Sequence, residues 1–224
     1  AGLREGTITG DTRFECTGAI QVPWTWDETK GNIYPCWIYR TGGAHNELNV
    51  VEAIQHSCDV FFYNVGTPRQ KPEGATDYEH YRDVVDYQTT ALGEQHYFDG
   101  LGIEKLKKNL TRRFWFGQPT GIDLPFEAEG LVPDPEWRFE TFNEGWSSGH
   151  TIITSIGQGD FMASPLQIAV NTASIANGGL LLRPRLLQTI VDDDGKEVQT
   201  FKPEKLRRIT IDEGHLELVR EGMH

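Results

Sequence analysis

The 224-residue sequence has no apolar run near the roughly 20 residues that a membrane-spanning helix needs, and residues 1–6 are not a signal peptide. Positive charge is also scarce: 21 Lys and Arg stand against 33 Asp and Glu, which gives a net charge of −12. Such a surface repels nucleic acid and anionic lipid, so we expect no nucleic-acid partner. With only three cysteines, a disulfide-stapled scaffold is excluded.

Apolar content is low for a chain of this length. Hydrophobic residues make up 38% and the mean hydropathy is −0.48, which predicts an incomplete or loop-rich core. We therefore expect one incomplete domain in six parts: a ribbon and loop region over 1–48, a helix over 49–66, a surface excursion over 67–98, a helical subdomain with loops over 99–179, a β-hairpin over 180–202 and the start of a further element over 203–224.

Two of the predicted helices have clear start signals. Asn49 with Glu52 three positions later forms a capping box, and apolar residues follow at helical spacing, with an interruption at Ser57 left open. Ser164-Pro165 is typical of an N-cap and a first helical position. Apolar residues then cover nearly every face of the helix over 166–176, which predicts that this helix is buried.

The triplet Ser57-Cys58-Asp59 lies within the first of these helices and is followed by three aromatic residues, 61–63. A Ser-x-Asn or Ser-x-Asp triplet is one element of the active-serine enzymes that recognise penicillin; the others are Ser-x-x-Lys and Lys-Thr-Gly. None of the six serines has a lysine three positions later, and neither Lys-Thr-Gly nor Lys-Ser-Gly occurs. The sequence therefore predicts the middle of an enzyme, between its nucleophile and its substrate-binding strand.

Three further tracts follow the triplet: Gly-Gln-Pro-Thr-Gly-Ile-Asp-Leu-Pro at 117–125, Ser-Ile-Gly-Gln-Gly at 155–159 and Ser-Pro-Leu-Gln-Ile-Ala at 164–169. In this order, the four tracts resemble the transpeptidase domain of class B penicillin-binding proteins, and most closely the elongation-associated type. Residues 67–98 fit that family least. The resemblance implies an α+β fold: a partial penicillin-binding/β-lactamase-like fold, with a helical subdomain and part of an antiparallel sheet.

Members of this family are D,D-transpeptidases that cross-link the stem peptides of peptidoglycan. A serine attacks the D-Ala-D-Ala carbonyl, releases D-Ala and passes the acyl group to an amine; penicillins acylate the same serine. The resemblance thus implies stem peptides and β-lactam antibiotics as ligands, and a glycosyltransferase partner in the parent complex. It also implies a parent enzyme of cell-wall synthesis and cell shape that acts outside the cytoplasm. That parent would be anchored by an N-terminal transmembrane helix absent from this chain.

Within this chain, the resemblance implies Ser57 and Asp59 as catalytic residues. A hydroxyl donates and accepts at once, so Ser57 can relay a proton between the catalytic lysine and the leaving amine. Asp59, where relatives often have Asn, would orient the substrate or the lysine, although a carboxylate accepts hydrogen bonds and cannot donate them. From the residues alone, Ser57 can equally be an exposed polar residue and Asp59 a helix cap.

The nucleophile and its lysine are expected before Ala1, so the chain by itself is predicted to be inactive. A competing function is a non-catalytic transpeptidase-like module for cell-wall assembly or for sensing peptides or β-lactams. A β-lactam sensor or a class D-like β-lactamase is a more distant alternative, which the long loops and the tract at 155–159 disfavour. In the family, residues 156–160 support the active site from the core.

A second candidate set combines Cys16, Cys36, His45 and Cys58. Three thiolates and an imidazole suit a tetrahedral zinc ion, which would fix the ribbon over 13–45 onto the helix that carries Ser57. Their spacing matches no compact zinc module, but some relatives place metal-binding groups at similar positions. The chemistry requires no cofactor, so this zinc would be structural. A Cys16–Cys36 disulfide and unpaired thiols stay open as alternatives, as does His56 as a substitute ligand.

Overall fold

The computed structural model describes residues 1–24, 27–67 and 100–224. The chain forms two compact units, each assembled from separate segments. Unit 1 comprises residues 1–106, 134–159 and 213–224, and unit 2 comprises residues 107–133 and 160–212. Helix α4 (Gly102–Arg112) runs from the first unit into the second. The surface excursion predicted over 67–98 lies outside the described residues, apart from Thr67.

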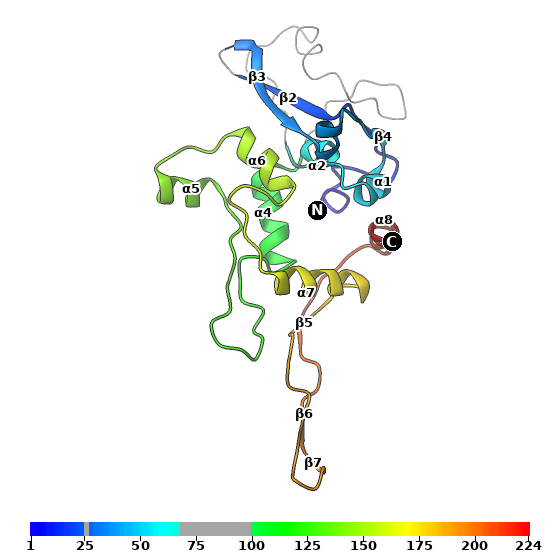
Figure 1. The fold of residues 1–224 in the computed structure, drawn as a ribbon, viewed down its shortest axis with the longest axis vertical. Coiled ribbons are helices and arrows are strands. Elements are labelled where there is room, and N and C mark those ends of the chain that lie inside the picture. Colours follow the sequence, from blue (N-terminus) through cyan, green and yellow to red (C-terminus); the bar gives the residue numbers. More distant parts are fainter. Residues whose placement is uncertain (25–26, 68–99) are drawn as a thin grey trace. The chain divides into compact units, whose positions relative to one another are not determined.

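Unit 1 combines short antiparallel ribbons with helices (Figure 1). Its elements are β1 (Phe14–Cys16), β2 (Ala19–Trp24), β3 (Asp27–Pro35), the 3₁₀ helix η1 (Trp37–Thr41), β4 (Asn46–Leu48), α1 (Val50–Gln55), α2 (Asp59–Gly66), α5 (Pro135–Phe142), α6 (Ser148–Ser155) and α8 (Glu213–Met223). Strand β1 pairs with β4, and β2 pairs with β3. The ribbon region predicted over 1–48 is thus present as two strand pairs, and the segment predicted over 203–224 contains α8.

The core of unit 1 forms around α2. Phe14 of β1 and Phe61 of α2 are 2% and 1% exposed, and their rings meet edge to face with centroids 5.1 Å apart. Helix α2 also packs closely on α6: a Cβ atom added at Gly66 would lie 2.2 Å from the Cβ of Ser155. Helix α8 approaches α1 in the same way, at Gly222. These contacts hold α1 and α2, the two helices on either side of Ser57.

The predicted capping box is confirmed at the start of α1. The Asn49 side chain accepts from the Glu52 N–H at 3.0 Å, and the Glu52 carboxylate accepts from the Asn49 N–H at 2.8 Å. The segment 49–66 is two helices, because the chain turns at Ser57, whose φ is 49°. A left-handed φ is uncommon for a residue with a side chain, and it ends α1 before α2 begins.

Unit 2 contains α7 (Pro165–Ala176) and four strands in two antiparallel pairs. β6 (Thr189–Val191) pairs with β7 (Glu197–Thr200), and this pair is the predicted hairpin. β5 (Leu180–Leu182) pairs instead with β8 (Lys205–Arg208), which lies beyond the predicted hairpin. The mixture of helices with short antiparallel strands agrees with the predicted α+β class.

The predicted burial of helix α7 on nearly all faces is wrong. Its buried side chains are polar: Gln167, Asn171 and Ser174 are 1%, 7% and 0% exposed, whereas Ile168 is 54% exposed. The Gln167 side-chain amide donates to two backbone carbonyls in the segment 118–129, each at 2.8 Å. A polar face can be buried when its hydrogen bonds are made. The apolar pattern of the sequence could not show that these partners exist.

Candidate functional site

The four predicted metal donors meet in unit 1, although each comes from a different element. Cys16 ends β1, Cys36 immediately precedes η1, His45 precedes β4, and Cys58 is the N-cap of α2. Their donor atoms all lie within 4.8 Å of one another. The pairing of β1 with β4 contributes directly, because it sets Cys16 opposite Asn46, the neighbour of His45.

A close backbone approach brings Cys36 to the same place. The Cys36 N–H donates to the carbonyl of Gly18 at 2.7 Å. Gly18 lies two residues after Cys16 in the sequence. Gly18 has a φ of +100°, and a Cβ atom there would lie 2.9 Å from the carbonyl oxygen of Gly43. Only glycine fits both the conformation and the space, so Gly18 is needed for the donors to converge.

The two sulfur–nitrogen distances that involve His45 match the spacing in a tetrahedral zinc site, and all four donor atoms lie within 4.8 Å of one another. Bonds of about 2.3 Å to sulfur and about 2.0 Å to nitrogen place two ligand atoms about 3.5 Å apart across a tetrahedral angle. The Sγ atoms of Cys16 and Cys36 each lie 3.6 Å from Nδ1 of His45. The three thiols are 0–1% exposed, and Nε2 of His45 is buried with no hydrogen-bond partner among the described residues.

One of the three thiols, Cys16, favours a negative charge. A hydrogen bond from the Cys58 thiol lowers the pKa of Cys16 to about 5. The same bond, together with burial, raises the pKa of Cys58, and burial raises that of Cys36. Cys16 is therefore the first thiol to ionise. A thiolate is the form of cysteine that binds metal.

The alternatives to a zinc site are a Cys16–Cys36 disulfide, unpaired thiols, and His56 as a substitute ligand. All three cysteines are free thiols in the structure, so it contains no Cys16–Cys36 disulfide. His56 is not one of the four converging donors. Its ring stacks on that of His45 with centroids 5.8 Å apart, which places it beside the set.

The Ser-x-Asp triplet lies directly against these donors, since Cys58 is its middle residue. Ser57 is exposed at the turn between α1 and α2, and its N–H donates to the carbonyl of Ile54 at 3.2 Å. Asp59 is the first residue of α2, and its Oδ2 accepts from the backbone N–H of Trp37 at 2.8 Å. Sequence reasoning missed Trp37; its position directly after Cys36 was the available signal.

The glycine-rich tract at 155–159 begins at Ser155, the last residue of α6, and packs within unit 1. Gly157 and Gly159 both have a φ of 72°, a left-handed conformation that favours glycine. A Cβ atom at Gly159 would lie 3.0 Å from the Ile153 side chain. At the other end of the tract, Ser155 contacts α2. The supporting role of residues 156–160 stays a prediction.

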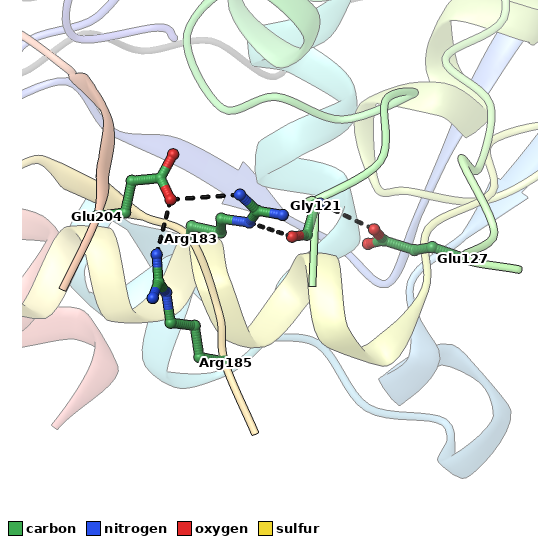
Figure 2. Close-up of polar contacts among 5 residues, drawn as sticks. All are labelled: Gly121, Glu127, Arg183, Arg185 and Glu204. Atoms are coloured by element: carbon green, nitrogen blue, oxygen red, sulfur yellow. Dashed lines mark hydrogen bonds and ion pairs between the residues drawn. The ribbon is translucent and has the colours of Figure 1, made fainter. Parts of the chain in front are cut away.

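Hydrogen bonds with charged side chains hold the tract at 117–125 within unit 2 (Figure 2). The Glu127 carboxylate accepts from the two successive N–H groups of Thr120-Gly121, at 2.7 and 2.8 Å. Although burial acts to raise it, these hydrogen bonds lower the pKa of Glu127 overall. Arg183 donates to the backbone carbonyl in the same loop, and Glu204 accepts from both Arg183 and Arg185, at 3.3 and 2.8 Å. Sequence reasoning missed this network.

Comparison with known proteins gives one consistent result. The chain matches the family model of the penicillin binding protein transpeptidase domain over residues 1–224. It is 38% identical over 187 residues to the peptidoglycan D,D-transpeptidase MrdA of Acinetobacter baumannii. That alignment covers 84% of this chain and 22% of the relative.

Solved structures of penicillin-binding protein 2 are similar over nearly the whole chain. The Pseudomonas aeruginosa protein in complex with WCK 5153 has a TM-score of 0.67 and 28% identity, and the match covers 99% of this chain and 40% of that one. The Helicobacter pylori protein in complex with MreC has a TM-score of 0.64 and 27% identity, covering 99% of this chain and 33% of that one. The chain therefore spans well under half of the length of each of these relatives.

Proposed function

This chain belongs to the penicillin-binding protein transpeptidase domain family, and from that membership we propose that it is an internal part of a longer peptidoglycan D,D-transpeptidase. The parent would cross-link stem peptides through a serine acyl-enzyme and would bind penicillin at the same serine. The observation that carries the proposal is the placement of Ser57, exposed in a left-handed turn between α1 and α2. Strained backbone of this kind is concentrated at functional sites.

Two residues of this chain would contribute to the reaction. Ser57 would relay a proton between the lysine of the parent and the leaving amine, because its exposed hydroxyl can donate and accept at once. Asp59 uses one carboxylate oxygen to hold the N–H of Trp37. Its second oxygen would be available to orient the substrate or the lysine. The nucleophilic serine, its lysine and the Lys-Thr-Gly strand would come from other parts of the parent.

Partners and location are also proposed from the family. We expect stem peptides and β-lactams as ligands, and a glycosyltransferase partner in the parent complex. The complex of the Helicobacter pylori relative with MreC supports a parent that works within a protein assembly. Peptidoglycan as the substrate implies action outside the cytoplasm, with the parent anchored in the membrane. Among the described helices of this chain, none is sufficiently long and apolar to cross a membrane.

The converging donors Cys16, Cys36, His45 and Cys58 would hold a structural zinc ion. The ion would cross-link strand β1, two loops and the start of α2, and the reaction itself would not use it. Zinc content per chain tests this directly. We expect one zinc in the wild-type chain and in Ser57→Ala, and a loss of bound zinc in Cys58→Ser. Equal zinc contents in the wild-type chain and Cys58→Ser would contradict the site.

Labelling with a fluorescent penicillin tests the enzymatic proposal. The parent protein should be labelled covalently, and this chain alone should not. In the parent, Ser57→Ala should lower the acylation rate about 10²- to 10⁴-fold, the range for loss of a positioned proton-transfer group. Ser148→Ala is the matched control, because Ser148 is also exposed and begins α6. Labelling of this chain alone would overturn the predicted division of the site, and an unlabelled parent would favour a non-catalytic module.

A further inference from the structure

Trp37 makes two hydrogen bonds that lie on either side of Ser57 in the sequence. Its backbone N–H donates to Oδ2 of Asp59 at 2.8 Å, and its indole Nε1–H donates to the backbone carbonyl of His56 at 2.9 Å. One acceptor belongs to the residue just before Ser57 and the other to the residue two positions after it. A single residue thus bridges the turn between α1 and α2.

The same residue is attached to the converging donors. Trp37 directly follows Cys36, and its ring lies 5.4 Å from the ring of His45 between centroids. Cys58, a third donor, is the residue next to Ser57. The loop that supplies two donors and the turn that carries Ser57 are therefore joined both through the donors and through Trp37.

Packing alone does not account for this arrangement. The Trp37 side chain is 54% exposed, so it contributes little to the core of unit 1. An exposed indole gains little from burial and is held here by directed hydrogen bonds. The turn that it bridges includes a residue with a φ of 49°, a conformation that persists only when the surrounding structure enforces it.

We propose that Trp37 is a positioning residue, which couples occupancy of the four-donor site to the conformation of Ser57, with Asp59 as its backbone anchor. This inference rests on the proposed structural zinc and on the proposed role of Ser57. Zinc binding orders the loop that begins at Cys36. Through its two hydrogen bonds, Trp37 then holds the turn in the left-handed conformation that presents the Ser57 hydroxyl.

Four variants of the 224-residue chain separate this role from general stability. Trp37→Phe keeps an aromatic ring near His45 and removes only the indole donor. Asp59→Ala removes the acceptor of the Trp37 N–H, whereas Asp59→Asn keeps an acceptor oxygen in place. Trp115→Phe is the matched control, because the Trp115 indole also donates to a backbone carbonyl, that of Pro119 at 2.8 Å, but lies in unit 2.

Zinc content and hydrogen exchange of residues 55–60 are the two readouts, measured with and without added zinc. In the wild-type chain, zinc should slow exchange over 55–60. In Trp37→Phe and Asp59→Ala, zinc should still bind, but exchange over 55–60 should be about fivefold to tenfold faster, as expected for one lost hydrogen bond. Asp59→Asn and Trp115→Phe should behave as the wild type.

A second readout uses the parent protein and a fluorescent penicillin. Trp37→Phe should lower the acylation rate constant and leave the dissociation constant of the initial complex unchanged, because the substituted group positions a relay and does not contact the ligand. Asp59→Asn should restore most of the rate that Asp59→Ala loses. A merely structural role of Trp37 would not produce this split.

The possible failures are distinguishable. If neither the wild-type chain nor any variant binds zinc, both the proposed metal site and the proposed coupling are wrong. The transpeptidase proposal is tested separately, by penicillin labelling. If zinc binds and exchange over 55–60 is equal in the wild type and Trp37→Phe, the coupling alone is wrong. Loss of zinc in Trp37→Phe would also overturn it, because Trp37 would then serve the metal site itself. Equal effects of Asp59→Asn and Asp59→Ala would overturn the role of Asp59 as an anchor.

Discussion

Replacing Gly66 by alanine should force helix α2 away from helix α6. A Cβ atom at position 66 would lie 2.2 Å from the Cβ and 2.9 Å from the Oγ of Ser155. Carbon atoms in contact normally lie about 3.5–4.0 Å apart, so one helix must move by about 1.3 Å or more. The obstructing Cβ is attached directly to the backbone of α6, and no side-chain rotation relieves it.

Two opposing effects determine how much Gly66→Ala changes the free energy of unfolding. Alanine is about 1 kcal/mol better than glycine inside a helix, which favours the variant. Overpacking costs about 1–3 kcal/mol in ordinary cases and more where backbone must move. Since the clash involves an atom fixed to the backbone, overpacking should win, with a net loss of about 2 kcal/mol. For a chain of this size, that loss lowers the melting temperature by about 4–8 °C.

Thermal unfolding, followed by circular dichroism, provides the measurement. Gly145→Ala is the matched control, because a Cβ atom there meets nothing within 4 Å, and its stability should stay within about 0.5 kcal/mol of the wild type. Ser155→Gly in the Gly66→Ala background should restore the space between the helices. The double-mutant cycle should then give a coupling energy of about 1 kcal/mol or more. An unchanged melting temperature in Gly66→Ala, or strictly additive effects, would refute the close approach.

Glu127→Gln should destabilise unit 2 by about 1–2 kcal/mol, because one of two backbone N–H groups loses its acceptor; Glu129→Gln, at an exposed position, should be neutral in the same denaturant titration. The difference in free energy of unfolding between these two variants should shrink as the pH is lowered. The folded-state pKa of Glu127 lies below the ordinary value of about 4.3, so its stabilisation is complete above that value and is lost as the pH falls through the lowered pKa. A stability difference that stays constant as the pH falls below about 4 would contradict this explanation. Tyr63→Phe should cost about 1 kcal/mol, because the 4% exposed Tyr63 donates its hydroxyl to the carbonyl of Pro35 at 3.1 Å. Tyr39→Phe, half-exposed and without a hydroxyl partner among the described residues, should change the melting temperature little, and equal stability of the two variants would argue against the Tyr63 bond.

Local signals predicted the features that depend on a few neighbouring residues. The capping box of Asn49 and Glu52 depends on four consecutive residues, so the start of α1 was predictable. Ser164-Pro165 likewise predicted the start of α7. The order of the four tracts predicted the family, which the family model confirms. A set of motifs in a given order is a property of the sequence and needs no coordinates.

The candidate metal site illustrates the limit of that reasoning. The residue types alone identified Cys16, Cys36, His45 and Cys58 as suitable zinc ligands, but their spacing matched no known module. Their convergence depends on the pairing of β1 with β4 and on the close approach at Gly18. Neither contact has a short-range sequence signal. The sequence could therefore name the donors and could not place them together.

By itself, the sequence determined the family, the Ser-x-Asp triplet, the candidate donors and the helix starts, because each is encoded in residue types or in short spacings. Only the tertiary structure decided that Ser57 adopts a left-handed conformation and that Trp37 bridges the turn around it through hydrogen bonds to His56 and Asp59. It also decided that α7 buries its polar face. These features depend on hydrogen bonds and packing between segments far apart in the chain. Whether such a hydrogen bond or packing contact forms depends on which distant segments the fold brings together, and short stretches of sequence do not show this.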